Sequence, residues 1–315
     1  MLILNSEPKF FSREAFKLLN TIGDVKEQEC NRNELLLTIP DVDILIIRLK
    51  NNIDDEVFSK AKKLKVIVSA TTGLNHIDLD AAKKNDVQVL SLRGEDEFLK
   101  SITATAELSW SLLLSFYRRI PDAINHVESG GWNRDKFRGK QLKGKTLGLV
   151  GFGRLGCIMS EYGKAFKMKV LATDPFVESM PNHVEKVGLK KLLNSSDIVS
   201  LHINYDSSNH EMFNDKLFMQ MKNGSVFLNT SRGELVNEKA LLKAIDSEKI
   251  SGALLDVLNN ENSIKEDWLI NSNIWKKSLI NENIIIVPHI GGATIESMEE
   301  TEVFMANKLV KYLQE

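Results

Sequence analysis

The sequence predicts an α/β protein with two doubly wound parallel sheets and a cleft between them. Short apolar runs of strand length alternate with helix-length segments along almost the whole chain, which is typical of parallel sheets with helices on both faces. This alternation occurs in two blocks, separated by a longer helical pattern at about 101–119. The length of 315 residues also exceeds what one hydrophobic core usually supports.

The first block contains four runs that we expect to form strands. They are Leu2–Leu4, Asp43–Arg48, Val66–Ala70 and Val87–Leu90. Helical patterns lie between them, at Ser12–Leu19 and at Asp54–Lys63. The second of these patterns begins with acidic residues and ends with lysines, the arrangement that a helix dipole favours. The block therefore predicts a parallel sheet of its own.

The second block begins after a glycine-rich loop around Trp132. Its strand-length runs are Thr146–Val150, Lys169–Ala172, Ile198–Leu201, Ser225–Leu228, Ala253–Asp256 and Ile284–Val287. The last segment, Thr294–Leu313, has a helical pattern. Ligands of such sheets bind beyond the carboxyl ends of the strands, so we expect the chemistry of the protein to lie there.

Composition and charge exclude several classes of protein. With 41 basic and 43 acidic residues, the net charge of −2 gives no broad positive field for nucleic acid or anionic lipid. No apolar run is long enough to span a membrane, and the chain has no signal-peptide core after Met1. Cys30 and Cys157 are too few for a disulfide framework or a cysteine-rich zinc site. We expect a cytoplasmic protein without a metal site and without a nucleic-acid or membrane partner.

A glycine-rich turn follows the predicted strand Thr146–Val150. It consists of Gly151, Phe152, Gly153, Arg154, Leu155 and Gly156. In a turn of this pattern the first glycine permits the tight bend, the second lets the backbone approach a pyrophosphate, and the third lets the next helix pack closely. Amides at the start of that helix attract phosphate. The second block therefore predicts a Rossmann-like domain in which these residues bind a dinucleotide.

An acidic residue follows the next strand, at the distance typical of a ribose ligand. Asp174 lies 18 residues after Gly156, just beyond the strand Lys169–Ala172. A carboxylate at this position accepts hydrogen bonds from both ribose hydroxyls of adenosine and repels a 2′-phosphate. We therefore expect NAD, rather than NADP, as the cofactor.

Three polar residues that follow predicted strands of the second block could perform a redox step. They are Arg232, Glu261 and His289. A histidine can donate or accept the hydroxyl proton because its unperturbed pKa lies near neutrality, and a neighbouring carboxylate favours its charged form. An arginine can bind a substrate carboxylate through two hydrogen bonds. We therefore predict these three as the catalytic residues of a hydride transfer.

Five ordered motifs make the chain resemble the D-2-hydroxyacid dehydrogenase family. They are Gly144–Gly156, Asp197–His202, Asn229–Val236, Leu255–Val257 and Pro288–Thr294. The resemblance covers about residues 40–300 and implies NAD-dependent hydride transfer to or from C2 of a D-2-hydroxy acid or 2-keto acid. It implies a flavodoxin-like substrate-binding domain of residues 1–95 and 291–315. The NAD-binding Rossmann domain, residues 96–290, is inserted between these two parts.

The same resemblance assigns further roles. It implies that Thr230 and Asp256 lie near the nicotinamide. It also implies that the backbone amides of Thr72, Gly73 and Leu74 bind the substrate carboxylate. Helices near 102–132 commonly form the dimer contact in this family, so we expect a homodimer.

The sequence departs from the family pattern after Glu261. Family members often have a proline next, where this chain has Asn262, and the 28 residues from Glu261 to His289 are more than many relatives have. The additional stretch within 262–283 contains Trp268 and Trp275. We expect a surface insertion that packs these two aromatic side chains, with a flap over the cleft as the alternative.

Two local resemblances point to different substrates. Ile47-Arg48-Leu49 is similar to the Val-Arg-Ser of 3-phosphoglycerate dehydrogenases, whose arginine helps bind the substrate. Thr103–Leu108 is more similar to glyoxylate and hydroxypyruvate reductases. We favour D-3-phosphoglycerate, with Arg48 as a substrate ligand and a role in serine biosynthesis, over glyoxylate or hydroxypyruvate reduction. An alternative of another class is an NAD-sensing binding protein similar to the corepressors built on this fold.

Overall fold

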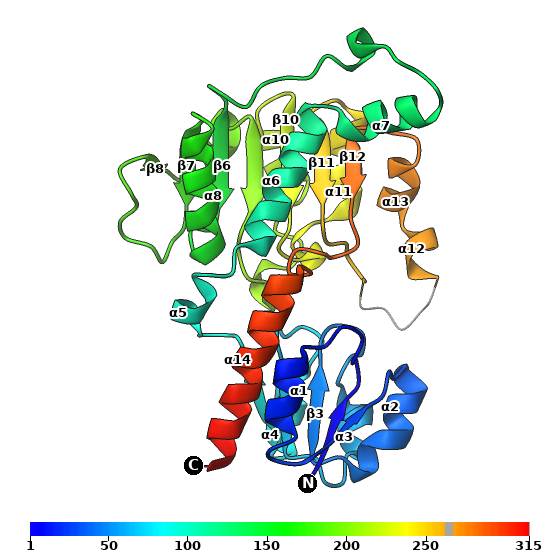
Figure 1. Cartoon of the computed structure of the whole chain (residues 1–315). Helices are drawn as coiled ribbons and strands as arrows, with labels where there is room; N and C mark the ends of the chain where they lie inside the picture. Colours follow the sequence, from blue (N-terminus) through cyan, green and yellow to red (C-terminus); the bar gives the residue numbers. More distant parts are fainter. Residues whose placement is uncertain (262–266, 315) are drawn as a thin grey trace. The chain divides into compact units, whose positions relative to one another are not determined.

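The computed structural model describes residues 1–261 and 267–314. The chain divides into two compact units (Figure 1). The smaller unit comprises Met1–Ile102 and Ala293–Glu315, and the larger unit comprises Thr103–Gly292. Each unit contains a parallel sheet with helices on both faces. The predicted fold class, α/β with two doubly wound parallel sheets, is confirmed.

The sheet of the smaller unit has the strand order β2-β1-β3-β4-β5, which is the order of flavodoxin-like folds. Its strands are β1 (Leu2–Asn5), β2 (Asp24–Glu27), β3 (Ile44–Ile47), β4 (Val66–Ser69) and β5 (Gln88–Ser91). Its helices are α1 (Arg13–Leu19), α2 (Arg32–Thr38), α3 (Asp55–Lys60), α4 (Leu79–Lys84), α5 (Asp96–Leu99) and α14 (Ile295–Gln314).

Strand β3 shows why this sheet is covered on both sides. All four of its residues are buried. Ile44 and Ile46 pack in one core with residues of α1 and α14, whereas Leu45 and Ile47 pack in another with residues of α2, α3 and α4. A strand without an alternating polar face can be stable only where helices cover both faces.

The sheet of the larger unit has the strand order β12-β11-β10-β9-β6-β7-β8. Its strands are β6 (Thr146–Val150), β7 (Lys169–Thr173), β8 (Val184–Lys186), β9 (Ile198–Leu201), β10 (Ser225–Asn229), β11 (Ile250–Leu255) and β12 (Ile284–Ile286). The chain builds the sheet outward from β6 on one side and then returns to the other side with β9. The strand order therefore reverses beside β6, which is where doubly wound folds bind their ligands.

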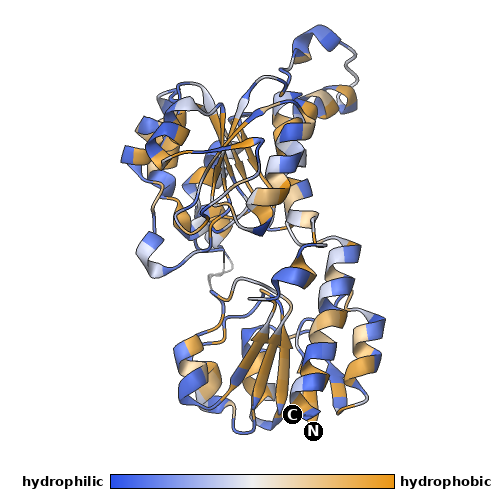
Figure 2. Ribbon diagram, turned by 90° about the vertical axis from the view of Figure 1, so that its left-hand side faces the viewer, coloured by the Kyte–Doolittle hydropathy of each residue, from blue (hydrophilic) through white to orange (hydrophobic). Residues whose placement is uncertain are grey.

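Helices cover both faces of this sheet too. They are α6 (Ala104–Tyr117), α7 (Ile120–Glu128), α8 (Arg154–Ala165), α9 (Leu189–Ser195), α10 (Asp215–Gln220), α11 (Glu238–Asp246), α12 (Trp268–Asn271) and α13 (Asn273–Ser278). Buried residues of α6 and α8 pack in one core, and those of α9, α10 and α11 in another. Figure 2 shows the strands of both units as apolar ribbons, with hydrophilic residues along their helices.

Two strands have no counterpart in the sequence prediction. Strands β2 and β8 lie at sheet edges, and they read Asp-Val-Lys-Glu and Val-Glu-Lys. Charged residues are usual on edge strands because they prevent pairing with another chain. Such short segments have no apolar run from which a strand could be predicted. Within the described part of the chain, no helix has the length and apolar character needed to cross a membrane.

The additional stretch after Glu261 folds into α12 and α13 where the structure describes it. Trp268 packs against the core of the larger unit, and Ile274 is fully buried there. Trp275 is half-buried. Asn262 and the rest of 262–266 lie outside the described residues.

Candidate active site

The turn between β6 and α8 requires its glycines. Gly151 has φ +94°, and a Cβ there would lie 2.4 Å from the carbonyl oxygen of His202. A Cβ on Gly156 would lie 2.5 Å from the carbonyl oxygen of Gly151, so α8 packs directly on the turn. At Gly153, by contrast, a Cβ would meet no described atom within 4 Å. The start of α8 therefore faces open space that a pyrophosphate can occupy.

Asp174 follows β7 and lies beside this turn. Its Oδ2 accepts a hydrogen bond of 2.8 Å from the amide of Phe152, and its Oδ1 accepts one of 2.8 Å from the amide of Phe176. These bonds fix the carboxylate at the end of the strand next to β6. The side chain is only half-buried, so its remaining lone pairs can accept ribose hydroxyls. The turn and this carboxylate together fit an NAD molecule.

His289 and Glu261 form the central contact of the candidate site. His289 follows β12, and its Nδ1 lies 2.7 Å from Oε1 of Glu261 in the loop after β11. The two side chains are 25% and 15% exposed, so the pair is partly shielded but reachable. The other carboxylate oxygen of Glu261 lies 3.4 Å from the amide of Leu258. The carboxylate thus fixes the ring through Nδ1 and leaves Nε2 for a ligand.

Asp256 holds the backbone around His289. This carboxylate follows β11 and is buried. Its oxygens accept hydrogen bonds of 2.7 Å from the amide of Ile290 and 2.9 Å from that of Gly291. Burial raises the pKa of the Asp256 carboxyl, which these two bonds and the nearby His289 oppose. His289 itself has φ +51°, a conformation that a side chain rarely adopts unless its surroundings impose it.

Arg232 lies in the turn after β10. The Asn229 side chain fixes this turn, accepting from the amide of Ser231 and donating to the carbonyl of Arg232. Burial lowers the pKa of the Arg232 guanidinium, and the negative charge of Glu261 is the main opposing influence. An arginine stays charged despite such a shift. The structure therefore brings all three predicted catalytic residues to one edge of the sheet, with Glu261 close enough to influence both others.

Several supporting residues were not identified from the sequence. A Cβ on Gly233 would lie 2.1 Å from the backbone of Leu258, so only glycine lets the two loops meet. The hydroxyl of Ser109 on α6 contacts that of Thr230 at 2.8 Å. The glycine after Arg232 was visible in the sequence, but its close contact depends on the register of β10 and β11. The Ser109 contact joins residues 121 positions apart and has no sequence signal.

In the smaller unit, the loop after β4 contains Thr72, Gly73 and Leu74. The hydroxyl of Thr71 contacts Ser69 Oγ and donates to the carbonyl of Gly73, each at 2.8 Å. The loop thus folds onto its own strand, with Thr72 exposed and the two following residues half-buried.

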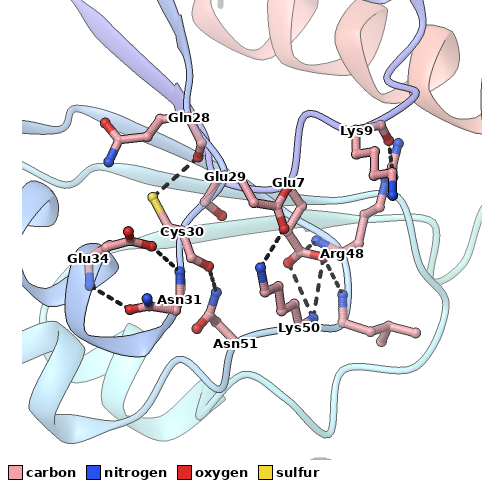
Figure 3. Close-up of polar contacts among 12 residues, drawn as sticks. Glu7, Lys9, Gln28, Glu29, Cys30, Asn31, Glu34, Arg48, Lys50 and Asn51 are labelled. Atoms are coloured by element: carbon pink, nitrogen blue, oxygen red, sulfur yellow. Dashed lines mark hydrogen bonds and ion pairs between the residues drawn. The ribbon is translucent and has the colours of Figure 1, made fainter.

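Arg48 follows β3 in the same unit (Figure 3). Its guanidinium forms an ion pair with Glu302 of α14 and donates a bond of 3.0 Å to the carbonyl of Lys9. The neighbouring Lys50 pairs with Glu29. Both cations of this loop therefore have an acidic partner within the unit. No group of three or more potential metal ligands occurs among residues that the structure describes.

The fold and the site define a class of protein. A strand, glycine turn and helix with a ribose-binding carboxylate bind NAD, and a histidine, glutamate and arginine at the same sheet edge suit redox chemistry at a hydroxyl-bearing carbon. The family model for the NAD-binding domain of D-isomer specific 2-hydroxyacid dehydrogenases matches residues 110–291. The chain belongs to this family, as the sequence predicts, and is an NAD-dependent D-2-hydroxyacid dehydrogenase.

Similar proteins cover nearly the whole chain. A hydroxypyruvate reductase of Thermotoga maritima is 33% identical over 92% of this chain and 91% of its own length. A D-3-phosphoglycerate dehydrogenase of Archaeoglobus fulgidus is 32% identical over 98% of this chain, which spans only 57% of that protein. The structure of a D-lactate dehydrogenase from Aquifex aeolicus with NAD and lactic acid has a TM-score of 0.85 at 26% identity, covering 100% of this chain and 96% of that one.

Proposed function

We propose that the protein reduces a small, unphosphorylated 2-keto acid of the hydroxypyruvate or glyoxylate type to the D-2-hydroxy acid. The observation that carries this proposal is the 2.7 Å contact between His289 and Glu261, close to the charge of Arg232. This constellation lies at the edge of the sheet that bears the NAD-binding turn. An acid–base pair beside a fixed cation is what reduction of a keto acid requires.

His289 is the proton donor in this proposal. NAD supplies the hydride when it is bound in reduced form. As hydride reaches C2, the carbonyl oxygen takes the proton from Nε2 of His289, and the ring is left neutral. Glu261 orients the ring through its contact with Nδ1. In the oxidative direction the same nitrogen accepts the hydroxyl proton.

Arg232 binds the substrate in this proposal. Its planar guanidinium can donate two parallel hydrogen bonds to the carboxylate or the carbonyl oxygen of a keto acid. Because burial has already removed much of its hydration, the charge acts strongly on a bound anion. We further propose that the backbone amides of Thr72, Gly73 and Leu74 contact the substrate carboxylate, and that Thr230 and Asp256 lie near the nicotinamide.

The charges around Arg48 favour an unphosphorylated substrate. A phosphate group needs uncompensated cations, but Arg48 pairs with Glu302 and Lys50 pairs with Glu29. The similarity to the hydroxypyruvate reductase over 92% of this chain and 91% of that one supports the same choice. D-3-phosphoglycerate, with a role in serine biosynthesis, is the second candidate, because Arg48 lies at the edge of the sheet where a ligand would bind.

Oxidation of NADH tests this proposal. The purified chain is supplied with glyoxylate, pyruvate, hydroxypyruvate and phosphohydroxypyruvate, and the loss of NADH absorbance is followed. We expect the largest kcat/KM with one of the unphosphorylated acids. A preference for phosphohydroxypyruvate would favour the second candidate. Tight NADH binding without turnover of any of the acids would favour an NAD-sensing protein.

We also propose that the chain forms a homodimer in the cytoplasm. Helix α7 has no buried residue, and its side chains Ile120, Ile124 and Val127 are 41%, 51% and 51% exposed. An apolar face of this kind is typical of a surface that another chain covers. Light scattering of the purified chain should give twice the mass of 35.5 kDa. Replacement of Ile124 by Glu should give the monomer mass instead.

A further inference from the structure

Arg48 lies at the same sheet edge as the proposed carboxylate-binding loop. Strands β3 and β4 are neighbours, with Ile47 opposite Ser69. Arg48 directly follows β3, and the loop containing Thr72 follows β4. Ligands of parallel sheets bind beyond the carboxyl ends of the strands. The charge of Arg48 would therefore act on any anionic group that a substrate carries beyond its carboxylate.

The guanidinium of Arg48 is held by a carboxylate that is itself fixed. Glu302 is only 3% exposed and pairs with Arg48 through Oε1. Its other oxygen accepts a hydrogen bond of 2.7 Å from the amide of Ser12, at the start of α1. This second bond does not depend on Arg48, so Glu302 remains in place whether or not the arginine moves. The ion pair therefore joins the half-buried Arg48 side chain to a buried carboxylate that a second hydrogen bond fixes.

The backbone of the same loop is also held by an acid. Glu7 is buried and accepts hydrogen bonds from the amides of Arg48 at 3.0 Å and of Leu49 and Lys50 at 3.3 Å. Figure 3 shows its carboxylate directed at this segment. With the backbone fixed, the arginine can leave Glu302 only by rotating its side chain. Both acids would also repel an incoming phosphate.

We propose that Glu302 determines substrate specificity by holding Arg48 and so excluding acids that carry a second anionic group. A phosphorylated keto acid could recruit Arg48 only by separating it from Glu302, which would leave a buried carboxylate unpaired. An unphosphorylated acid imposes no such cost. This inference rests on the proposed function and adds the residue that restricts its substrate class.

The variant Glu302→Gln tests the inference. Glutamine keeps the size of the side chain and an oxygen for the Ser12 amide, but it removes the charge that holds Arg48. Steady-state kinetics of NADH oxidation would be compared for hydroxypyruvate and phosphohydroxypyruvate. We expect the ratio of kcat/KM, phosphorylated over unphosphorylated, to rise at least about tenfold, the effect of gaining one charge-assisted hydrogen bond.

Two controls separate this effect from general changes. Glu300→Gln removes the same charge from an exposed position of α14 and should leave the ratio unchanged. The double variant Glu302→Gln, Arg48→Gln should not show the rise in the kcat/KM ratio, because it lacks the Arg48 guanidinium that Glu302→Gln releases. If thermal unfolding shows that Glu302→Gln does not fold, Glu302→Asp keeps the charge but shortens its reach. It should raise the ratio in the same direction.

The inference and the proposed function can fail separately. An unchanged ratio in folded, active Glu302→Gln overturns the inference alone. If the wild-type chain reduces none of the four acids, the proposed function fails, and binding of phosphohydroxypyruvate to the NADH-loaded chain still tests Glu302. The variant should then bind at least about tenfold more tightly, and equal affinity contradicts the inference. A wild-type preference for phosphohydroxypyruvate overturns both.

Discussion

Glu261 in the larger unit and Glu302 in the smaller unit each bind a basic side chain, but with opposite consequences. Glu261 contacts His289, whose imidazole is a side chain that can act as a proton donor and acceptor in catalysis. Glu302 contacts Arg48, whose guanidinium stays charged in proteins. The first pair can therefore change its charge during a reaction, and the second cannot. The basic partner, rather than the carboxylate, decides whether the contact is reactive or only neutralises a charge.

Both pairs are supported in the same way by a second, buried acid. Asp256 accepts hydrogen bonds from the amides of Ile290 and Gly291 beside His289. Glu7 accepts them from the segment that begins at Arg48. Burial raises the pKa of both carboxyls. In each unit, then, one acid binds the backbone beside the basic residue and another acid binds its side chain. The two arrangements differ in that basic residue, which is a histidine in one unit and an arginine in the other.

Replacing His289 should have the largest effect on turnover. We expect His289→Ala to lower kcat by about 10²–10⁴-fold, the usual contribution of a general acid. The Kd for NADH, measured by fluorescence titration, should change little, because we propose that the nucleotide binds at the turn after β6. His210→Ala, at an exposed histidine, serves as the control and should keep wild-type activity. Turnover that survives the loss of His289 would remove this residue from the mechanism.

Arg232 can be compared with Arg48, since both are arginines at the carboxyl edge of a sheet. Arg232→Ala should lower kcat/KM by about 10²–10³-fold, because in the proposed function this cation binds the substrate and stabilises developing charge. The KM for the keto acid should rise and kcat should fall together. Arg232→Lys should recover only part of the loss, since an ammonium group cannot make the paired contact. An unchanged KM would contradict a substrate-binding role.

The site residues that could be predicted from the sequence lie within short motifs, close in the sequence to the elements that position them. The turn at Gly151 lies within a few positions of its strand and helix, and Asp174 lies at a fixed distance from it. The ion pair of Arg48 and Glu302 joins residues 254 positions apart, and nothing near either residue indicates the other. The sequence therefore suggested Arg48 as a substrate ligand, while its pairing depends on how α14 packs beside α1.

Asp174 forms no ion pair with a residue that the structure describes, and its replacement should change activity less than that of His289 or Arg232. Its oxygens accept hydrogen bonds from the amides of Phe152 and Phe176, which would orient them for the proposed contact with ribose hydroxyls. Asp174→Asn removes the repulsion of a 2′-phosphate and should shift the kcat/KM ratio of NADPH to NADH upward by about tenfold or more. Kinetics with both cofactors at one keto acid concentration measure this ratio. A constant ratio would contradict the ribose assignment.

His202 provides the reverse case, a histidine whose partner is a hydroxyl instead of a carboxylate. Its Nε2 lies 2.8 Å from Ser200 Oγ, and within the described structure its buried Nδ1 has no partner. Burial lowers the pKa of His202 from 6.5 to about 4. Below pH 6.5 the unfolded chain binds a proton that the folded chain does not. The stabilisation that a neutral His202 gives is therefore present above pH 6.5 and is lost as the pH falls towards about 4.

The variant His202→Gln has no such proton to bind and should lose less stability in acid. Urea unfolding at the two ends of this pH range gives the free energy of unfolding at each pH. We expect this free energy to fall by about 1–3 kcal/mol less in the variant than in the wild type. His210→Gln, an exposed histidine, should follow the wild-type dependence. Equal losses in His202→Gln and the wild type would mean that His202 is charged in the folded chain. The comparison of the two histidines by their partners, the hydroxyl of Ser200 and the carboxylate of Glu261, would then fail.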